Sequence, residues 1–224
     1  MATPWQTLER SETPDGVLEL RLRGEDDYLV CIDGRILMNS HASRSERALA
    51  ERACERVAER EAPRVLVGGL GMGLTLRAAL DALPATATVV VAELNPVIVD
   101  WCRGPLAATN HGACADPRVE VRLEDAARTI AASRGLDAIL LDLYEGPHAH
   151  TPRKDPFYGN EALHRTWAAL APGGVFAVWS EDPDPDFEAR LRKARFEVTR
   201  HRPGRGGRRH AVTIAVRQEP KTRR

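Results

Sequence analysis

The segment Arg64–Gly73, with the sequence RVLVGGLGMG, decides the fold because it joins an apolar strand to a glycine turn. Its apolar run Val65-Leu66-Val67 does not alternate with polar residues, which is typical of a strand buried on both faces of a parallel sheet. Gly69, Gly71 and Gly73 then precede a helical pattern. Glycine lets the backbone turn tightly and present N–H groups to a ligand at the start of a helix. This combination predicts a nucleoside or nucleotide site at the turn.

Downstream of this turn, strands and helices alternate with short connections. The predicted strands are 64–68, 88–93, 118–123, 136–142 and 175–179, followed by closing strands at 196–200 and 211–216. The predicted helices are about 73–83, 96–107, 125–133, 159–170 and 184–194. Strict alternation of this kind predicts an α/β, Rossmann-like fold with a mostly parallel seven-stranded sheet and helices on both faces.

Upstream of the turn, the sequence pattern is that of a small antiparallel unit. Val17–Arg23 alternates apolar with polar residues, and Asp33-Gly34 is a strong hairpin turn. A helical pattern follows at 43–62 and is expected to end at Pro63.

Three parts of the chain follow from these patterns. Residues 1–42 are expected to form a short N-terminal β-hairpin extension, residues 43–217 the Rossmann-like domain that binds the ligand, and residues 218–224 a basic tail. One large domain is what a chain of this length accommodates.

The charges of the chain balance, with 32 Lys+Arg and 32 Asp+Glu among 224 residues. Together with 43% hydrophobic residues, this balance argues against global disorder and against a nucleic-acid partner bound by bulk positive charge. The charges are distributed unevenly along the chain, because Arg190–Arg224 holds 13 basic and 2 acidic residues. We interpret this end as solvated, and the acidic remainder favours a cationic ligand.

The four cysteines, Cys31, Cys54, Cys102 and Cys114, form no CxxC pair. We interpret them as reduced thiols, and no metal site is expected. The N-terminus has no apolar signal segment, and no apolar run approaches the ~18 residues of a membrane span. The expected location is therefore the cytoplasm, with no membrane partner.

Residues that directly follow strands are the candidate site residues, because ligands bind at the carboxyl ends of the strands in a doubly wound sheet. Glu93 ends the second strand, 20 residues beyond Gly73, where a carboxylate can accept hydrogen bonds from ribose hydroxyls. Asp125 follows the third strand. It either accepts the exocyclic amine of adenine or caps the next helix, and the two roles are compatible.

Asp142, Tyr144 and Glu145 lie on one short segment after the fourth strand and are the candidate catalytic residues. Two carboxylates and a phenol at this rim can hold a substrate cation or accept a proton from an attacking amine or hydroxyl. Asp142 ends a buried apolar run, which argues against a purely solvated role.

Other residues near this rim are given structural roles. Trp179 is interpreted as part of the core and His210 as a surface residue. Glu181 is interpreted as part of a solvated turn, with the attraction of a cationic acceptor as the minor alternative. His148 and His150 are not expected to bind a metal, because a metal needs further ligands in a defined geometry.

Together these segments resemble the spermidine synthase-like (polyamine aminopropyltransferase-like) group of class I S-adenosylmethionine-dependent transferases, over roughly residues 28–217. The matching segments are Asp33-Gly34, Gly68–Gly73, Ala92–Pro96, Asp116–Val121, Asp125, Asp142 and Ala171–Gly174. The resemblance implies a class I methyltransferase fold and an S-adenosyl cofactor, either S-adenosylmethionine or its decarboxylated form. The cofactor contacts that it implies are Gly69, Gly71, Gly73, Glu93, Leu94, Asp125, Ala126 and Asp142.

The resemblance also implies a reaction, the transfer of a methyl or an aminopropyl group to a small, cationic acceptor. In it, Asp142 matches the base and amine-binding aspartate of the group, Glu145 lies near its second acidic position, and a homodimer is suggested. Where the group has a glutamine and a Tyr-His pair, this chain has Leu37–Glu46 without that motif, so putrescine is not assigned as the acceptor. Methyl transfer requires partners for the methionine carboxylate, such as the loop N–H groups, Arg44 or Arg47.

A non-catalytic alternative stays open from the sequence. The chain can be a nucleoside-binding or nucleic-acid-associated module that retains the fold, since fold does not determine function.

Overall fold

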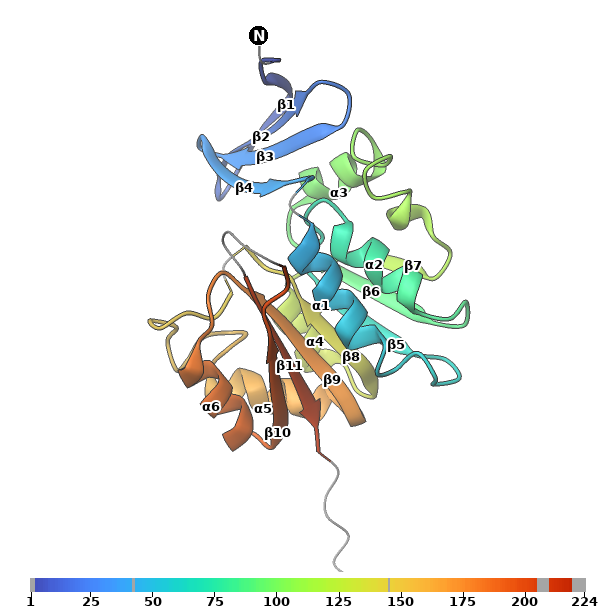
Figure 1. The fold of residues 1–224 in the computed structure, drawn as a ribbon, viewed down its shortest axis with the longest axis vertical. Helices are drawn as coiled ribbons and strands as arrows, with labels where there is room; N and C mark the ends of the chain where they lie inside the picture. Colours follow the sequence, from blue (N-terminus) through green and yellow to red (C-terminus); the bar gives the residue numbers. More distant parts are fainter. Residues whose placement is uncertain (1–2, 42, 145, 205–209, 219–224) are drawn as a thin grey trace, which may run out of the picture.

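The computed structural model describes residues 3–41, 43–144, 146–204 and 210–218, and these residues form two sheets. The first is antiparallel, with four strands in the order β1 (Gln6–Thr13), β2 (Gly16–Arg23), β3 (Asp27–Ile32) and β4 (Arg35–Asn39). Figure 1 shows it in blue at one end of the molecule, with the larger sheet and its helices beyond it.

The second sheet has seven strands in the order β10-β11-β9-β8-β5-β6-β7. The strands that pair in parallel are β5 (Arg64–Gly68), β6 (Thr88–Glu93), β7 (Val119–Leu123), β8 (Leu136–Leu141) and β9 (Leu170–Ser180). The two antiparallel closing strands are β10 (Phe196–His201) and β11 (Ala211–Arg217). The predicted Rossmann-like α/β fold is confirmed, with its topological switch point between β5 and β8.

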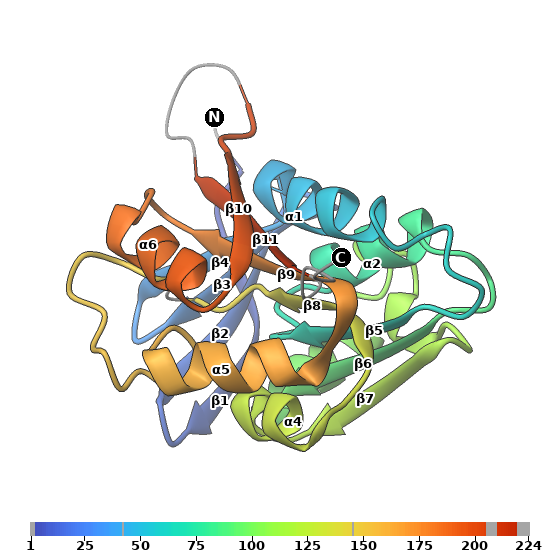
Figure 2. The ribbon, with the colours of Figure 1, turned by 90° about the horizontal axis from the view of Figure 1, so that it is seen from below.

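Helices cover both faces of the second sheet (Figure 2). Along one face lie α1 (Arg44–Cys54), α2 (Leu74–Ala82) and α3 (Pro96–Arg103), and along the other lie α4 (Ala126–Ala132), α5 (Asn160–Ala169) and α6 (Pro185–Lys193). The strands divide their side chains accordingly: Val65 and Val67 pack into the core of the first face and Leu66 into that of the second. The unbroken apolar run of β5 is therefore the result of burial on both faces.

The N-terminal sheet is larger than the expected hairpin, because it begins with β1. Leu8 is the only apolar residue of β1 and is 41% exposed, so no alternating pattern marks this strand in the sequence. Pairing with β2 holds it in place, as does a hydrogen bond of 2.6 Å from the Trp101 indole Nε1–H to Glu9 Oε2. This bond joins the N-terminal sheet to α3.

The first helix is shorter than expected, since it ends at Cys54 well before Pro63. Turns follow it, in which the N–H of Arg60 donates to the carbonyl of Val57 at 3.1 Å. These turns place the Arg60 guanidinium on the carboxylate of Asp137, a buried residue of β8, and this ion pair favours the turns over further helix.

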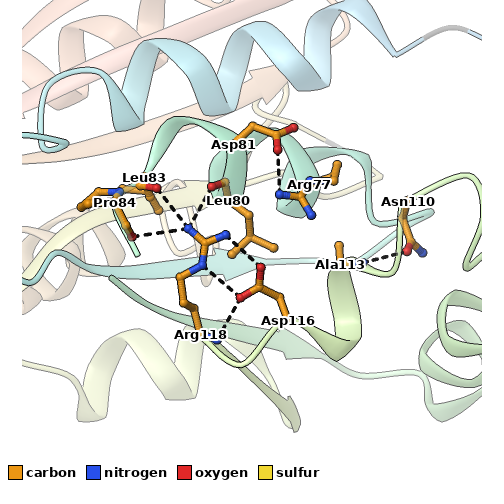
Figure 3. Close-up of polar contacts among 9 residues, drawn as sticks. All are labelled: Arg77, Leu80, Asp81, Leu83, Pro84, Asn110, Ala113, Asp116 and Arg118. Atoms are coloured by element: carbon orange, nitrogen blue, oxygen red, sulfur yellow. Dashed lines mark hydrogen bonds and ion pairs between the residues drawn. The ribbon is translucent and has the colours of Figure 1, made fainter. Parts of the chain in front are cut away.

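Asp116 and Arg118 form a clamp between the start of β7 and the end of α2 (Figure 3). Arg118 Nη1 donates to the carbonyl oxygens of Leu80 at 2.9 Å and Leu83 at 3.0 Å, while Nη2 donates to Asp116 Oδ2 at 2.8 Å. The hydrogen bond from Arg118 is the main cause that lowers the pKa of Asp116 to about 2. This part of the segment Asp116–Val121 therefore stabilises the fold.

Within the described residues, no helix is both long and apolar enough to cross a bilayer.

Candidate active site

A cavity of about 260 Å³ lies beside the glycine loop, at the carboxyl ends of β5 and β8. Ligands of doubly wound sheets bind at this switch point. Four parts of the chain line it. They are Ile36, Leu37, Met38 and Asn39 of β4 with Glu46 of α1; Leu70, Gly71, Met72 and Leu74; Asp142, Leu143 and Tyr144 after β8; and Trp179, Glu181 and His210 of the β9–β11 side.

The glycine loop, residues 68–73, requires its glycines. Gly69, Gly71 and Gly73 have φ values of +87°, +54° and +80°, in the left-handed region that favours glycine. A Cβ at Gly69 would lie 2.6 Å from the carbonyl oxygen of Asp142, and one at Gly73 would lie 2.9 Å from Cβ of Asn110. The loop is thus packed against its supports, while Gly71 stays open toward the cavity.

Glu93 fixes the loop to the end of β6. Its Oε2 accepts from the N–H of Leu70 at 2.9 Å, and its Oε1 accepts from the N–H of Asn95 at 2.8 Å. Each oxygen keeps a second lone pair for a hydroxyl donor. Glu93 does not line the 260 Å³ cavity, and the neighbouring Leu94 is 66% exposed. These two residues lie outside the cavity, on the same rim of the sheet.

Asp125 caps α4, which is one of the two roles expected for it. Its Oδ1 accepts from the N–H groups of Ala127 at 2.6 Å and Arg128 at 3.0 Å. Its Oδ2 has no hydrogen-bond partner in the described part of the chain, so it is available to an amine donor. Ala126 is buried, close to the backbone of Gly68, and does not line the cavity.

Asp142 is a half-buried residue on the cavity wall, and its Oδ2 accepts from Thr75 Oγ1 at 2.5 Å. Burial of the carboxyl group, and after it the charge of Glu46, raise its pKa to about 7, against the lowering effect of the Thr75 hydrogen bond. Tyr144 lies nearby, 42% exposed, with the Arg35 guanidinium 4.8 Å from its ring centroid. Glu145, the third predicted catalytic residue, lies outside the described residues.

Among the charged and aromatic residues of the cavity, Glu46, Trp179 and His210 were not predicted as site residues. The interpretation of His210 as a surface residue was wrong, because its ring lies 4.8 Å from that of Trp179 and both line the cavity. Trp179 packs against the core, as expected, and its half-buried ring also lines the cavity. Glu181 lines the cavity too, where its alternative role of attracting a cation would place it. The pairing of Ala211 with Ser180 explains this, since it places His210 opposite Glu181.

The cavity is acidic. Asp142, Glu46 and Glu181 line it, whereas no Lys or Arg is among the described residues that do so. The two arginines considered for a methionine carboxylate are not there: Arg47 lines a different cavity, and Arg44 lines neither. This arrangement can hold cations and can move a proton at a carboxylate.

No group of three or more His, Cys, Asp or Glu side chains in the described ranges could hold a metal ion.

Comparison with curated proteins finds polyamine aminopropyltransferases, whereas no family model matches. The protein of Mycobacterium tuberculosis is 30% identical over 165 residues, which are 72% of this chain and 30% of that protein. The protein of Aeropyrum pernix is 31% identical over 164 residues, which are 71% of this chain and 50% of that protein. The chain therefore spans no more than half the length of these two relatives.

Comparison with solved structures finds spermidine synthases. The enzyme of Thermotoga maritima has a TM-score of 0.76 at 20% identity, over 94% of this chain and 72% of that one. A spermidine synthase in complex with the transition-state analogue AdoDATO has a TM-score of 0.74 at 19% identity, with the same coverage. A probable spermidine synthase of Corynebacterium glutamicum has a TM-score of 0.66 at 20% identity, over 94% of this chain and 79% of that one. At these identities the comparisons establish the fold.

Proposed function

Because the chain is spermidine synthase-like in sequence and fold, we propose that it is an aminopropyltransferase that uses decarboxylated S-adenosylmethionine and a small amine acceptor. The observation that carries this proposal is the position of Asp142, on an acidic cavity that begins at the glycine loop. We assign residues 43–217 as the catalytic domain and residues 1–42 as an extension whose strand β4 supplies one cavity wall.

The described residues fit an S-adenosyl cofactor. Gly71 leaves the loop open toward the cavity just before α2, and the N–H groups of Gly71 and Met72 donate to no protein acceptor within the described residues. Glu93 keeps lone pairs for the ribose hydroxyls, and Asp125 keeps Oδ2 for the adenine amine. We assign Leu94 and Ala126 to the adenine side of the same site.

The charge of the cavity supports the decarboxylated form. S-adenosylmethionine carries an α-carboxylate, which would face three carboxylates and, among the described lining residues, no arginine or lysine. Decarboxylation leaves only an ammonium group at that end, which the acids stabilise by opposite charge. The transferred group is therefore aminopropyl rather than methyl.

Asp142 is the proposed base. The bound cofactor supplies a carbon activated by a sulfonium leaving group, so the protein has to align the amine and remove a proton. Thr75 donates to Oδ2, which leaves Oδ1 to accept from the amine. With a pKa of about 7, Asp142 binds and releases a proton near neutral pH, which suits a general base. Tyr144 and the unplaced Glu145 stay candidates for holding the acceptor.

The acceptor is a small amine whose far end is apolar. Of the four β4 residues that line the cavity, Ile36, Leu37 and Met38 are apolar and Asn39 is uncharged, so this wall fits a hydrocarbon body better than a second ammonium group. The volume of about 260 Å³ limits the size of what fits beside the aminopropyl group.

Calorimetry and mass spectrometry test the proposal together. The full chain is titrated with decarboxylated S-adenosylmethionine and with S-adenosylmethionine, and is then incubated with a panel of monoamines and diamines while the aminopropyl product is detected by mass. We expect tighter binding of the decarboxylated form, and turnover that Asp142→Asn abolishes. Asp182 is exposed and follows Glu181 in the sequence, but it does not line the cavity. Asp182→Asn is therefore the matched control, because it removes the same charge from a residue outside the proposed site. Preference for S-adenosylmethionine would indicate methyl transfer, and binding without any turnover would favour a non-catalytic module.

A further inference from the structure

Two cysteines lie against the glycine loop, one on α3 and one on the short 3₁₀ helix η1 (Ala113–Ala115). The thiol of buried Cys102 donates to the carbonyl oxygen of Gly71, with an Sγ–O distance of 3.1 Å. The segment that carries Cys114 lies beside α3, because Asn110 forms hydrogen bonds with the backbone of Cys102 and of Ala113. The single S–H hydrogen of Cys102 is donated to the loop.

A buried asparagine fixes these two segments to each other. Asn110 Nδ2 donates to the carbonyl of Cys102 at 3.0 Å, and Asn110 Oδ1 accepts from the N–H of Ala113 at 3.1 Å, a bond drawn in Figure 3. Asn110 is fully buried, and its Cβ packs where Gly73 has no side chain. The two cysteines and the loop thus share one rigid support.

Cys114 is the more reactive of the two thiols. The hydrogen bond from Cys102 and the positive charge of Arg103 lower the pKa of Cys114, although partial burial opposes them. The pKa of Cys102 is raised by its hydrogen bond with Cys114 and by burial. Cys114 is also only half-buried, so a small oxidant can reach it.

We propose that Cys102 and Cys114 form a redox-sensitive dithiol that a peroxide oxidises to a disulfide, and that this oxidation loosens the glycine loop. The Cys114 thiolate attacks one peroxide oxygen, the O–O bond breaks, and Cys114 becomes a sulfenic acid as one water leaves. The Cys102 sulfur then attacks the Cys114 sulfur, the S–O bond breaks, and a second water carries away the thiol proton. In total, two thiols lose two electrons and one hydrogen peroxide becomes two waters.

The loop responds because the disulfide has no S–H hydrogen. Gly71 then loses the donor to its carbonyl, at a position where the loop forms the cavity wall. The effect on S-adenosyl binding rests on the proposed function, whereas disulfide formation and loop mobility do not.

The test oxidises the reduced full chain with one equivalent of hydrogen peroxide. Free thiols are then blocked and the digest is searched by mass for a peptide linked through Cys102 and Cys114. Hydrogen exchange of residues 69–73 and binding of methylthioadenosine are measured before and after. We expect the linked peptide, faster loop exchange and about a three- to tenfold loss of affinity, the effect of losing one hydrogen bond. Dithiothreitol reverses all three, which excludes methionine oxidation as the cause.

Three variants sharpen the result. Cys114→Ser is expected to be insensitive to peroxide, and Cys102→Ala to show the faster loop exchange without oxidant. Cys31→Ser is the matched control, since burial raises the pKa of Cys31, and it is expected to respond as the natural chain does. Absence of the linked peptide, or a linked peptide without a change in loop exchange, would overturn the proposal. If the reduced chain does not bind methylthioadenosine, the proposed function fails. Detection of the linked peptide and hydrogen exchange of the loop then still test whether Cys102 and Cys114 form the dithiol.

Discussion

Replacing the proposed base, Asp142, by asparagine is expected to stabilise the folded protein while removing its activity. The ordinary pKa of 3.8 rises to about 7 in the folded state. Between these pH values the folded protein holds a proton at Asp142 that the unfolded chain has released. The stability of the natural chain therefore falls as the pH rises through this window. Asparagine has no charge to bury, and its amide oxygen can still accept from Thr75.

The magnitude follows from the two pKa values. A rise from 3.8 to about 7 corresponds to about 4 kcal/mol above pH 7, at 1.36 kcal/mol for each pH unit. This is an upper bound, because Asp142 is only half-buried and lines the cavity. We expect Asp142→Asn to raise the free energy of unfolding by about 2 kcal/mol at pH 8 and by about zero at pH 4.

Urea unfolding at pH 4, 5, 6, 7 and 8, followed by circular dichroism, measures this difference directly. Asp182→Asn is the control, and as an exposed change it is expected to stay within about 0.5 kcal/mol of the natural chain throughout. An increase in the free energy of unfolding that does not depend on pH would refute the burial of a carboxylate at this position. An Asp142→Asn variant that is less stable than the natural chain at pH 8 would refute it too.

Three further substitutions test the site and its supports. Glu93→Ala is expected to weaken binding of methylthioadenosine by about 1.5–3 kcal/mol in calorimetry, the range for hydrogen bonds to charged groups, and unchanged affinity would mean that the nucleoside binds elsewhere. Gly73→Ala places a Cβ 2.9 Å from Cβ of Asn110 at a φ of +80°, so we expect a loss of about 1–3 kcal/mol in urea unfolding. Arg118→Met removes the clamp on α2 and is expected to lower the free energy of unfolding by about 3 kcal/mol. The exposed pair of Arg122 with Glu120 is its control: Arg122→Met should lose less than about 1 kcal/mol, and equal losses would contradict a structural role for the clamp.

The parts of the fold that the sequence predicts are those determined by local patterns. The apolar run of β5 and the glycines after it are sufficient to predict the strand, the turn and the helix start, because each depends on a few adjacent residues. β1 is not predictable in this way. It is a polar strand, held by backbone pairing with β2 and by one indole hydrogen bond to Glu9, and neither leaves a periodic signal in the sequence.

The candidate site is predictable on the side formed by strand ends and not on the others. Asp142 and Tyr144 follow a strand directly, so the rule for doubly wound sheets places them on the rim. Glu46 and His210 reach the same cavity from α1 and from the start of β11, more than 60 residues away on either side. Their positions depend on strand order and on the pairing of β11 with β9, which no local pattern specifies.

The division of the cavity between two sheets has an evolutionary consequence. The residues proposed to hold the cofactor lie at strand ends of the large sheet, whereas the wall of Ile36, Leu37 and Met38 belongs to the small one. Under the proposed function, substitutions in β4 therefore change which amines are accepted while leaving the glycine loop, Glu93 and Asp125 untouched. A lineage with this architecture can explore new acceptors through a strand of five residues, Arg35–Asn39, and keep one donor throughout.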